Sequence, residues 1–480
     1  MRFARASFAL ALTTLAGAAL AQPTISSLVK RNQWVPDIGF VTTVDAIAVN
    51  NNGWWLVESD TDHADTNADR VLIRNGVVHV RENDAVPPSP AAISSFDSVN
   101  LNNNGDTGWN LFLRNTGSTS NDSGIYFNTT LLIQESMLST AEDFTQGTPY
   151  IGFFECKTND NNEILVVASV DDPAIATSVD RAIVVLRYDA GAGTFTEEVW
   201  AKEGDFPPGI VDGTQVVDFG TGTENFAFAN DGRVMAAASL TGATATNGGL
   251  WIESTLIARK GDESPIAGRT YTDLGTSTKL DMNNNGDYVF KATISGDAAT
   301  NLILVRNGQL FKQEGDPVPG VAGETIVSFG TGPVRITDNG DVVWWAQFTG
   351  DTTTNTALFI NNTLLVRRGV TVIDGEVLTT VSGTTGTGGI TEGFTISDNG
   401  RYIVFRGVTS PTGVGAFMID MGGGCLADFN GSGGTPDDAD VAAFFDAWND
   451  GDTSADVNGS GGTPDDADVA YFFDRWNAGC

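Results

Sequence analysis

The sequence predicts a mainly β protein, in which a seven-bladed β-propeller is closed by an N-terminal strand and followed by a small α-helical module. Three observations predict this fold. A turn signal rich in Asn and Gly recurs seven times, a second hairpin follows this turn along the repeats, and the last part of the chain contains one segment twice. Two hairpins supply four strands per repeat, which is the make-up of a propeller blade.

The chain begins with the features of a secretory signal peptide. Arg2 and Arg5 precede a run made mostly of Ala and Leu at 6–20, and Ala-Leu-Ala at 19–21 fits a cleavage site. A membrane anchor would need a longer and more apolar run, and no later segment is apolar enough to span a membrane. We therefore expect residues 1–21 to be removed, and the protein to be secreted, extracellular or attached to the cell surface.

Seven turn signals divide the region from 22 to 421. Each turn is entered by alternating residues and left by an apolar run, and Asn-Gly between two such runs is a strong hairpin signal. Asn and Gly also accept the positive φ that a tight turn needs. The copies are Asn50–Gly53, Asn102–Gly105, Asn159–Asn162, Asn230–Gly232, Asn283–Gly286, Asp338–Gly340 and Asp398–Gly400.

A second hairpin supplies the two outer strands of each repeat. A linker with Gly-Asp and then Gly or Pro-Gly follows several of these hairpins and leads to the next repeat, as at 204–209. The predicted outer hairpins are Val71–Val80, Ile125–Gln134, Ile183–Ala201, Leu250–Arg259, Leu302–Lys312 and Leu358–Arg367.

The two ends of the repeat region indicate how the ring closes. After the seventh turn only the strands at 402–406 and 416–421 follow, so the last blade lacks one strand. Residues 25–29 near the mature N-terminus supply it, and this pairing leaves no free sheet edge. We therefore predict one propeller over 22–421, a Gly linker at 422–424 and a separate domain at 425–480.

The duplicated C-terminal segment carries two sets of calcium-ligand residues. Oxygen-bearing side chains at alternate positions, followed by Gly, are typical of an EF-hand-type calcium loop. The twelfth loop position is Ala439 in one copy and Ala467 in the other, so we expect the acid one residue later to close each site. The predicted ligands of two Ca²⁺ ions are Asp428, Asn430, Ser432, the carbonyl of Gly434 and Asp440, and then Asp456, Asn458, Ser460, the carbonyl of Gly462 and Asp468.

Each loop leads into an amphipathic helix. Thr435 is a suitable N-cap, with Pro436 at the first helical position and Asp438 three residues after the cap. The helices then place Val441, Phe444, Phe445 and Trp448, and their copies Val469, Phe472, Phe473 and Trp476, on one apolar face each. We expect these faces to pack on each other, and we assign partner binding to Phe445, Trp448, Phe473 and Trp476.

With these loops and helices, the C-terminal domain resembles a dockerin, of the Gly-Cys-ending type found on exported proteins of planctomycete-like bacteria. The resemblance implies calcium-dependent attachment to a cohesin-like receptor. An antiparallel helix pair would bring the two ends of the domain together, so we expect a disulfide between Cys425 and Cys480. Cys156 then remains, and its apolar surroundings favour a buried thiol over a nucleophile.

The repeat region resembles the NxxGxxxF tandem repeats of exported bacterial proteins with interchangeable C-terminal anchors. The best match is Asn283–Phe290. No activity is established for that family, so the resemblance implies none for this chain. The excess of 60 Asp and Glu over 26 Lys and Arg makes nucleic acid an unsuitable partner.

Motifs for catalysis are absent from the sequence. It has no nucleophile elbow, zinc-ligand spacing or phosphate loop, and it contains only two His. The segments at 337–344 and 397–405 look like the Ser/Thr-x-Asp-x-Gly-x-x-Trp box of sialidase-like propellers, but Asp directly follows Ser or Thr, so we interpret both as turns. A carboxylate pair for glycoside cleavage is not selected by the sequence alone.

Several classes of function remain open. We favour a noncatalytic propeller, displayed outside the cell through its dockerin-like module, that binds a glycan or a protein on its loop face. The alternative is a carbohydrate-active hydrolase or lyase recruited to an extracellular assembly for polysaccharide degradation, and a third is a surface-layer structural component. An enzyme would need acidic residues that converge at one mouth of the propeller, and the candidates are Asp45, Asp97, Asp218 and Asp273.

Overall fold

The protein forms two compact units, one made of Ile25–Ile419 and a smaller one that contains the C-terminal helices. The computed structural model describes residues 23–175, 177, 179–382, 393–422, 427, 429–430, 436–455, 457 and 463–478. The predicted signal peptide lies outside these residues. Among the residues that the structure describes, no helix has the length and hydrophobicity of a membrane-spanning segment.

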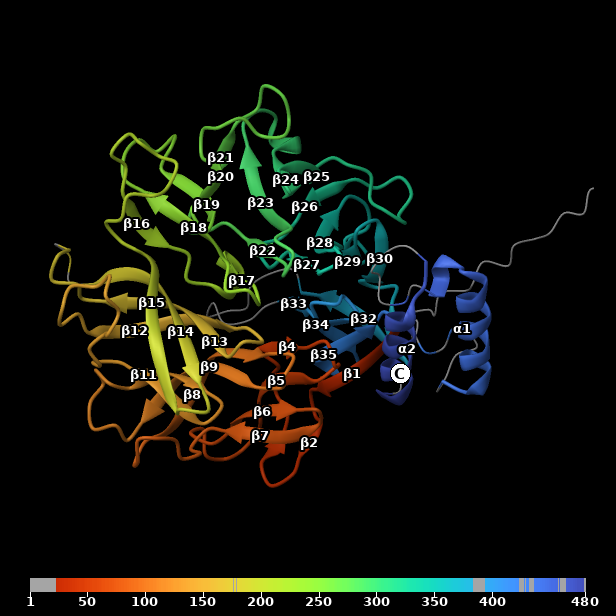
Figure 1. Cartoon of the computed structure of the whole chain (residues 1–480), viewed down its shortest axis with the longest axis horizontal. Helices are drawn as coiled ribbons and strands as arrows, with labels where there is room; N and C mark the ends of the chain where they lie inside the picture. Colours follow the sequence, from red (N-terminus) through yellow and green to blue (C-terminus); the bar gives the residue numbers. More distant parts are fainter. Residues whose placement is uncertain are drawn as a thin grey trace, which may run out of the picture. The chain divides into compact units, whose positions relative to one another are not determined.

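The larger unit is a seven-bladed β-propeller, as the sequence predicts. Seven antiparallel sheets are arranged around a common axis, each with its first strand innermost (Figure 1). The first three blades contain four strands each, which are β4 (Ile47–Val49), β5 (Trp55–Asp60), β6 (Arg70–Arg74) and β7 (Val77–Arg81), then β8 (Ala92–Leu101), β9 (Thr107–Arg114), β10 (Ser123–Phe127) and β11 (Thr130–Gln134), then β12 (Tyr150–Thr158), β13 (Glu163–Val170), β14 (Asp180–Asp189) and β15 (Thr194–Lys202).

The next three blades differ in that their innermost strand is interrupted. Two short segments of the chain pair with the same second strand, so each sheet counts five strands. These are β16 (Val216–Phe219), β17 (Phe226–Phe228), β18 (Val234–Leu240), β19 (Gly248–Ile252) and β20 (Thr255–Arg259), then β21 (Tyr271–Asp273), β22 (Leu280–Met282), β23 (Tyr288–Ile294), β24 (Leu302–Arg306) and β25 (Gln309–Gln313), then β26 (Ile326–Ser328), β27 (Arg335–Ile336), β28 (Val342–Phe348), β29 (Thr356–Ile360) and β30 (Thr363–Arg367). Two 3-10 turns, Thr223–Asn225 and Ala298–Thr300, lie in blades 4 and 5.

The seventh blade joins the two ends of the propeller sequence. The N-terminal strand β1 (Thr24–Lys30) pairs with β35 (Gly413–Asp420) as its outer strand, so no sheet edge is left open between the chain ends. The other strands of this blade are β31 (Val372–Ile373), β32 (Glu376–Val381), β33 (Phe394–Ile396) and β34 (Tyr402–Ser410). A separate two-stranded hairpin, β2 (Trp34–Val35) and β3 (Gly39–Phe40), follows β1.

Large apolar side chains fill the space between neighbouring blades. Trp344 of β28 is fully buried, and its ring stacks on that of Phe359 with 4.5 Å between the centroids. Val289 and Leu304 of the preceding blade pack in the same cluster. Because protein interiors pack closely, these contacts fix the angle between blades and hold the innermost strands around the axis.

The smaller unit contains α1 (Asp438–Asp450), a 3-10 turn (Thr453–Ala455) and α2 (Asp466–Ala478). The apolar faces of the helices pack on each other as predicted, with the rings of Phe444 and Phe472 stacked at 4.2 Å between centroids. The predicted cap at Thr435 was wrong, because the N-cap is Asp437. Asp437 accepts from the N–H of Ala439 at 2.8 Å, while Asp440 accepts from the N–H of Asp437, which completes a capping box two residues later than expected.

Candidate functional site

The seven turns that follow the innermost strands form a ring around the propeller axis. The backbone N–H of the residue two places before the end of a turn donates to a side-chain oxygen of the corresponding residue in the next blade. The ring runs through Asn51, Asn103, Asp160, Asn230, Asn284, Asp338 and Asp398, with donor–acceptor distances of 2.7–3.0 Å. Two contacts of the ring differ: Asp338 donates to the backbone oxygen of Asp398, and Asn399 donates to Asn51.

Asn at the first and third turn positions adds further bonds between blades. The first-position amide donates to a carbonyl of the next turn, as from Asn50 to Asn102 at 2.9 Å. The third-position amide does the same, as from Asn52 to Asn103 at 2.9 Å. Positive φ is confined to the fourth position in these turns, for example Gly53 at 73°. The Asn residues therefore link blades, a role that turn propensity alone did not reveal.

Amide and carboxylate side chains satisfy one another in part of this ring. Asp160 accepts from the amides of Asn103 and Asn230, at 2.9 and 2.7 Å. Asn103 also donates to Asp398 at 2.9 Å. Burial raises the pKa of Asp398 to about 6, with further upward contributions from nearby carboxylates such as Asp338, while the bond from Asn103 opposes the rise. The carboxyl group of Asp398 is therefore mostly protonated below about pH 6.

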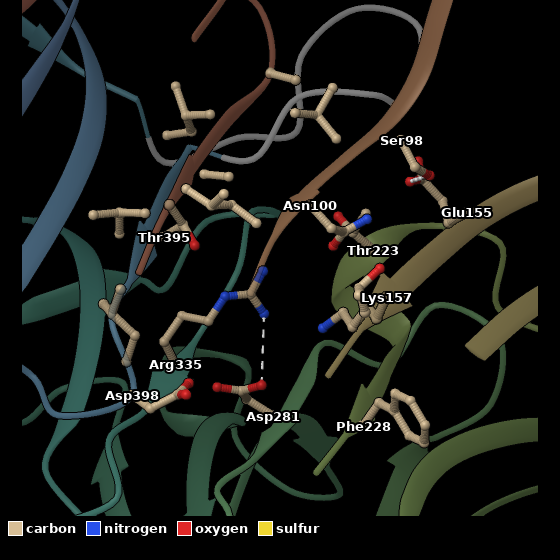
Figure 2. Close-up of a pocket in the computed structure, with 18 of the residues that line it drawn as sticks. Ser98, Asn100, Glu155, Lys157, Thr223, Phe228, Asp281, Arg335, Thr395 and Asp398 are labelled. Carbon is tan, nitrogen blue, oxygen red and sulfur yellow. Dashed lines mark hydrogen bonds and ion pairs between the residues drawn. The ribbon is translucent and has the colours of Figure 1, made fainter. Parts of the chain in front are cut away.

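A cavity of about 180 Å³ lies on the axis beside the ring. Every blade contributes residues of its innermost strand, or residues next to that strand, to the cavity wall (Figure 2). Its neutral polar lining includes Ser98, Asn100, Thr223 and Thr395, and its charged lining residues are Asp97, Glu155, Lys157, Asp281, Arg335 and Asp398. Both signs of charge thus converge on one polar space that is partly open to solvent.

Two cationic side chains reach this cavity from opposite blades. Arg335 on β27 is 5% exposed, and its Nη1 lies 3.9 Å from Oδ1 of Asp281. The other oxygen of Asp281 accepts from the N–H of Ile336 at 3.0 Å. Lys157 on β12 approaches the cavity from the side opposite Arg335. Its ammonium group points toward the Arg335 side of the cavity, and the Arg335 guanidinium points toward the Lys157 side (Figure 2).

Two carboxyl groups on the β8 and β12 side of the cavity are held by hydrogen bonds. Burial raises the pKa of Asp97 to about 7, although the amide of Asn110 donates to it at 2.6 Å and opposes the rise. Glu155 accepts from the hydroxyl of Ser98 at 2.5 Å. A carboxyl group that titrates near neutral pH can act as a general acid or base, so Asp97 has the proton affinity that such chemistry requires.

Cys156 follows Glu155 in β12 and is the buried thiol that the sequence predicts. Its side chain is fully buried and forms no disulfide. Burial raises the pKa of the Cys156 thiol far above its ordinary value, with the neighbouring Glu155 adding to the rise. Its surroundings therefore disfavour the reactive thiolate.

The four acidic candidates from the sequence do not gather at one place. Among them only Asp97 lines the axial cavity. Asp45 lies between blades 1 and 7, 4.0 Å from Nη2 of Arg406, and Asp218 pairs with Arg181 at 3.4 Å. Asp273 lines a separate surface pocket between blades 5 and 6. The described structure therefore gives no carboxylate pair drawn from this set.

The C-terminal unit includes three of the predicted calcium ligands. Asp440 is 1% exposed, and its carboxylate accepts from the N–H of Asn430 at 3.1 Å, so the acid that follows the loop lies beside the second predicted ligand. Asp468 is equally buried and accepts from the N–H of Asp465 at 2.9 Å. Carboxylate, amide and hydroxyl oxygens are the ligands that Ca²⁺ takes in proteins, so the residue types suit this ion.

The remaining calls on this domain lie outside the described residues. They are the ligands Asp428, Ser432, Gly434, Asp456, Asn458, Ser460 and Gly462, and the predicted disulfide partners Cys425 and Cys480.

The four aromatic residues assigned to partner binding are half-buried against the helical pair. Phe445 and Phe473 approach each other with 6.1 Å between ring centroids. The indole N–H of Trp448 donates to the backbone oxygen of Asp465 at 3.1 Å, which joins α1 to the start of α2. Trp476 packs on Phe473. These side chains therefore stabilise the pair, and each keeps part of its surface accessible.

A family of unknown function, DUF7453, matches residues 40–307, which is more than half of the 480 residues. The chain belongs to this family. The match covers blades 1 to 4 and all but the outer strand of blade 5, and therefore most of the cavity wall, including Asp97, Lys157 and Asp281. No curated protein matches the chain.

The chain is also similar to solved structures at low identity. An oligogalacturonate lyase in complex with manganese has 9% identity and a TM-score of 0.40, over 84% of this chain and 97% of that one. A polysaccharide lyase, Uly1, has 10% identity and a TM-score of 0.34, over 83% and 98%. An α-L-arabinofuranosidase of Fusarium graminearum has 10% identity and a TM-score of 0.29, over 83% and 98%. Likenesses of this size carry no conclusion about activity.

Sequence reasoning missed the cationic residues of the cavity, although the repeats contain a signal for them. The residue five places before the last residue of each turn occupies the same register in every blade. In chain order these residues are Ala48, Asn100, Lys157, Ala227, Asp281, Arg335 and Thr395, and five of the seven are polar or charged. A strand position that is polar in most of the seven repeats points to the cavity.

Proposed function

We propose that the chain is an exported binding protein whose propeller holds a small polar ligand in the axial cavity without catalysing a reaction. The observation that carries this proposal is the convergence of Lys157, Arg335 and neutral polar side chains on one space of about 180 Å³. Moving an ion from water into a protein interior costs several kcal/mol. Residues that served only to pack the blades together would not need to be charged. Enclosed sites with a few convergent polar groups are where ligands bind.

The proposal includes the way in which the propeller is held. The signal peptide directs export, and the dockerin-like domain attaches the chain to a cohesin-like receptor once its two loops bind Ca²⁺. Support comes from the oxygen-rich loop residues and from the position of Asp440 beside Asn430. The weak affinity typical of extracellular calcium modules, about 10⁻⁴ to 10⁻³ M, fits a site with few charged ligands.

Calorimetry on the mature full-length protein tests both parts. Titration with a panel of mono- and oligosaccharides should give binding to the propeller, and titration with Ca²⁺ should give two sites. If no member of the panel binds, the ligand-binding role is contradicted. If Ca²⁺ does not bind up to about 10 mM, which exceeds the range of extracellular modules, the docking role is contradicted.

A second candidate function is a carbohydrate-active hydrolase or lyase. The observation that favours it is Asp97, a carboxyl group on the cavity wall with a pKa of about 7. Incubation of the protein with uronate-containing and neutral polysaccharides, followed by analysis for new reducing ends or unsaturated products, tests it. Turnover that Asp97→Asn abolishes would establish the enzyme, and the absence of products would leave the binding role.

A further inference from the structure

Two cationic residues, Arg335 and Lys157, face the axial cavity, whose wall also holds the acidic residues Asp97, Glu155, Asp281 and Asp398. Arg335 comes from blade 6 and Lys157 from blade 3, so the two cations face the same space from opposite sides (Figure 2). Electrostatic interactions in an enclosed site of low dielectric are several times stronger than in water. An anionic group placed between the guanidinium and the ammonium would interact with both. A planar carboxylate matches the fork of donors on Arg.

The acidic lining residues direct their oxygens to partners in the protein. Asp281 accepts from Ile336 and lies beside Arg335. Glu155 accepts from Ser98, and the amide of Asn103 donates to Asp398. These hydrogen bonds fix the carboxylates in place but leave their charge, so a ligand carboxylate would have to lie between the two cations.

The rest of the wall suits a ligand with hydroxyl groups and an apolar face. Ser98, Asn100, Thr223 and Thr395 can each donate or accept a hydrogen bond, and the ring of Phe228 supplies an apolar surface. The cavity volume of about 180 Å³ is below the ~300 Å³ at which sites for drug-sized ligands begin, so the enclosed part of the ligand is about one sugar ring in size. Neither an inorganic anion nor a neutral sugar uses all of these groups.

We propose that the ligand is an acidic sugar, whose carboxylate lies between Arg335 and Lys157 and whose hydroxyl groups contact the neutral polar residues of the cavity. This inference rests on the proposed binding function and specifies the ligand class of the same site. The carboxylate supplies the charge for the two cations, and the sugar ring packs on Phe228.

Calorimetry on the full-length protein with glucuronate, glucose, acetate and phosphate tests the ligand class. Glucuronate should bind at least about tenfold more tightly than each of the other three, a difference of about 1.4 kcal/mol. Equal binding of glucose would overturn the acidic-sugar inference and leave the binding function in place. Equal binding of acetate or phosphate would reduce the site to a general anion site and overturn the sugar part. If neither glucuronate nor glucose binds, both the inference and the proposed function fail for sugars of this size.

Two variants locate the carboxylate. Lys157→Met should weaken glucuronate binding at least about tenfold, because the ligand carboxylate loses a charge-assisted hydrogen bond. Arg335→Lys keeps the charge that faces Asp281 but loses the planar fork, and should also weaken binding. Lys312→Met, which removes a lysine from the outer strand β25, is the matched control and should bind as the unmodified protein does. Unchanged affinity in both cavity variants, with folded protein by circular dichroism, would overturn the inference.

Discussion

Replacing Asn102 by Ala should destabilise the propeller more than its single side chain suggests. Asn102 is 4% exposed and makes one bond within its turn and one to the next blade. Its amide donates to the backbone oxygen of Asn159 at 3.1 Å, and its side-chain oxygen accepts from the N–H of Asp106 at 2.8 Å. Asn102→Ala removes the partners of both backbone groups. A buried group left without a partner costs roughly 1–3 kcal/mol, so the expected loss is about 2–4 kcal/mol.

Thermal unfolding, followed by near-ultraviolet circular dichroism, measures this loss. Unfolding entropy is about 2.1 cal/mol/K per residue, so for a propeller of this size a loss of 2–4 kcal/mol lowers Tm by about 2–5 °C. The matched control is Asn104→Ala in the same turn, where an exposed amide makes one bond to the backbone oxygen of Asp160 at 2.8 Å. The control should lose about 1 kcal/mol or less. Equal Tm values for the two variants would refute the greater weight given to the buried bonds of Asn102 over the exposed inter-blade bond of Asn104.

Three further predictions follow from the charges of the ring, the cavity and the calcium loops. The pKa of Asp398 is raised from 3.8 to about 6, so its contribution to stability is present at acidic pH and is lost as pH rises between these values. At pH 8, Asp398→Asn should therefore unfold at a higher temperature than the unmodified protein, by the equivalent of about 1–3 kcal/mol. At pH 4 the variant should show no such gain. Binding of glucuronate should tighten as pH falls from 8 to 6, because Asp97 and Asp398 take up protons with pKa values of about 7 and about 6. Their protonation removes negative charge from a wall that also contains Asp281 and Glu155. A flat calorimetric affinity over this range would contradict the placement of the carboxylate. Asp440→Asn should weaken the first calcium site at least about tenfold while it keeps an oxygen for the capping box, whereas Asp446→Asn on the exposed side of α1 should leave the calorimetric isotherm unchanged.

The fold was predictable because its signals are local and repeated. The turn at Asn283–Gly286 and the hairpin at 302–312 each follow from residues that are neighbours in the sequence. The need to supply one missing strand then predicted that β1 pairs with β35, although these strands lie at opposite ends of the propeller sequence. The opposing faces of α1 and α2 followed in the same way from the spacing of Phe444 and its copy Phe472.

The site was less predictable because its contacts join distant residues. Asn51 and Asn103 are 52 positions apart, and nothing in either turn alone indicates that one donates to the other. Lys157 and Arg335 belong to different blades, and they line the same cavity only because the ring closes. The helix cap failed for another reason: Thr435 and Asp437 each stand three residues before an Asp, so the sequence offers two capping boxes and the structure uses the second.

A crystal structure of the full-length protein with glucuronate, at a concentration that calorimetry shows to be saturating, tests the central claim most directly. The account predicts a sugar in the axial cavity, with its carboxylate within hydrogen-bond distance of both Arg335 and Lys157. A saturated protein whose sugar lies on an outer surface of the propeller, with the axial cavity free of it, would contradict the account.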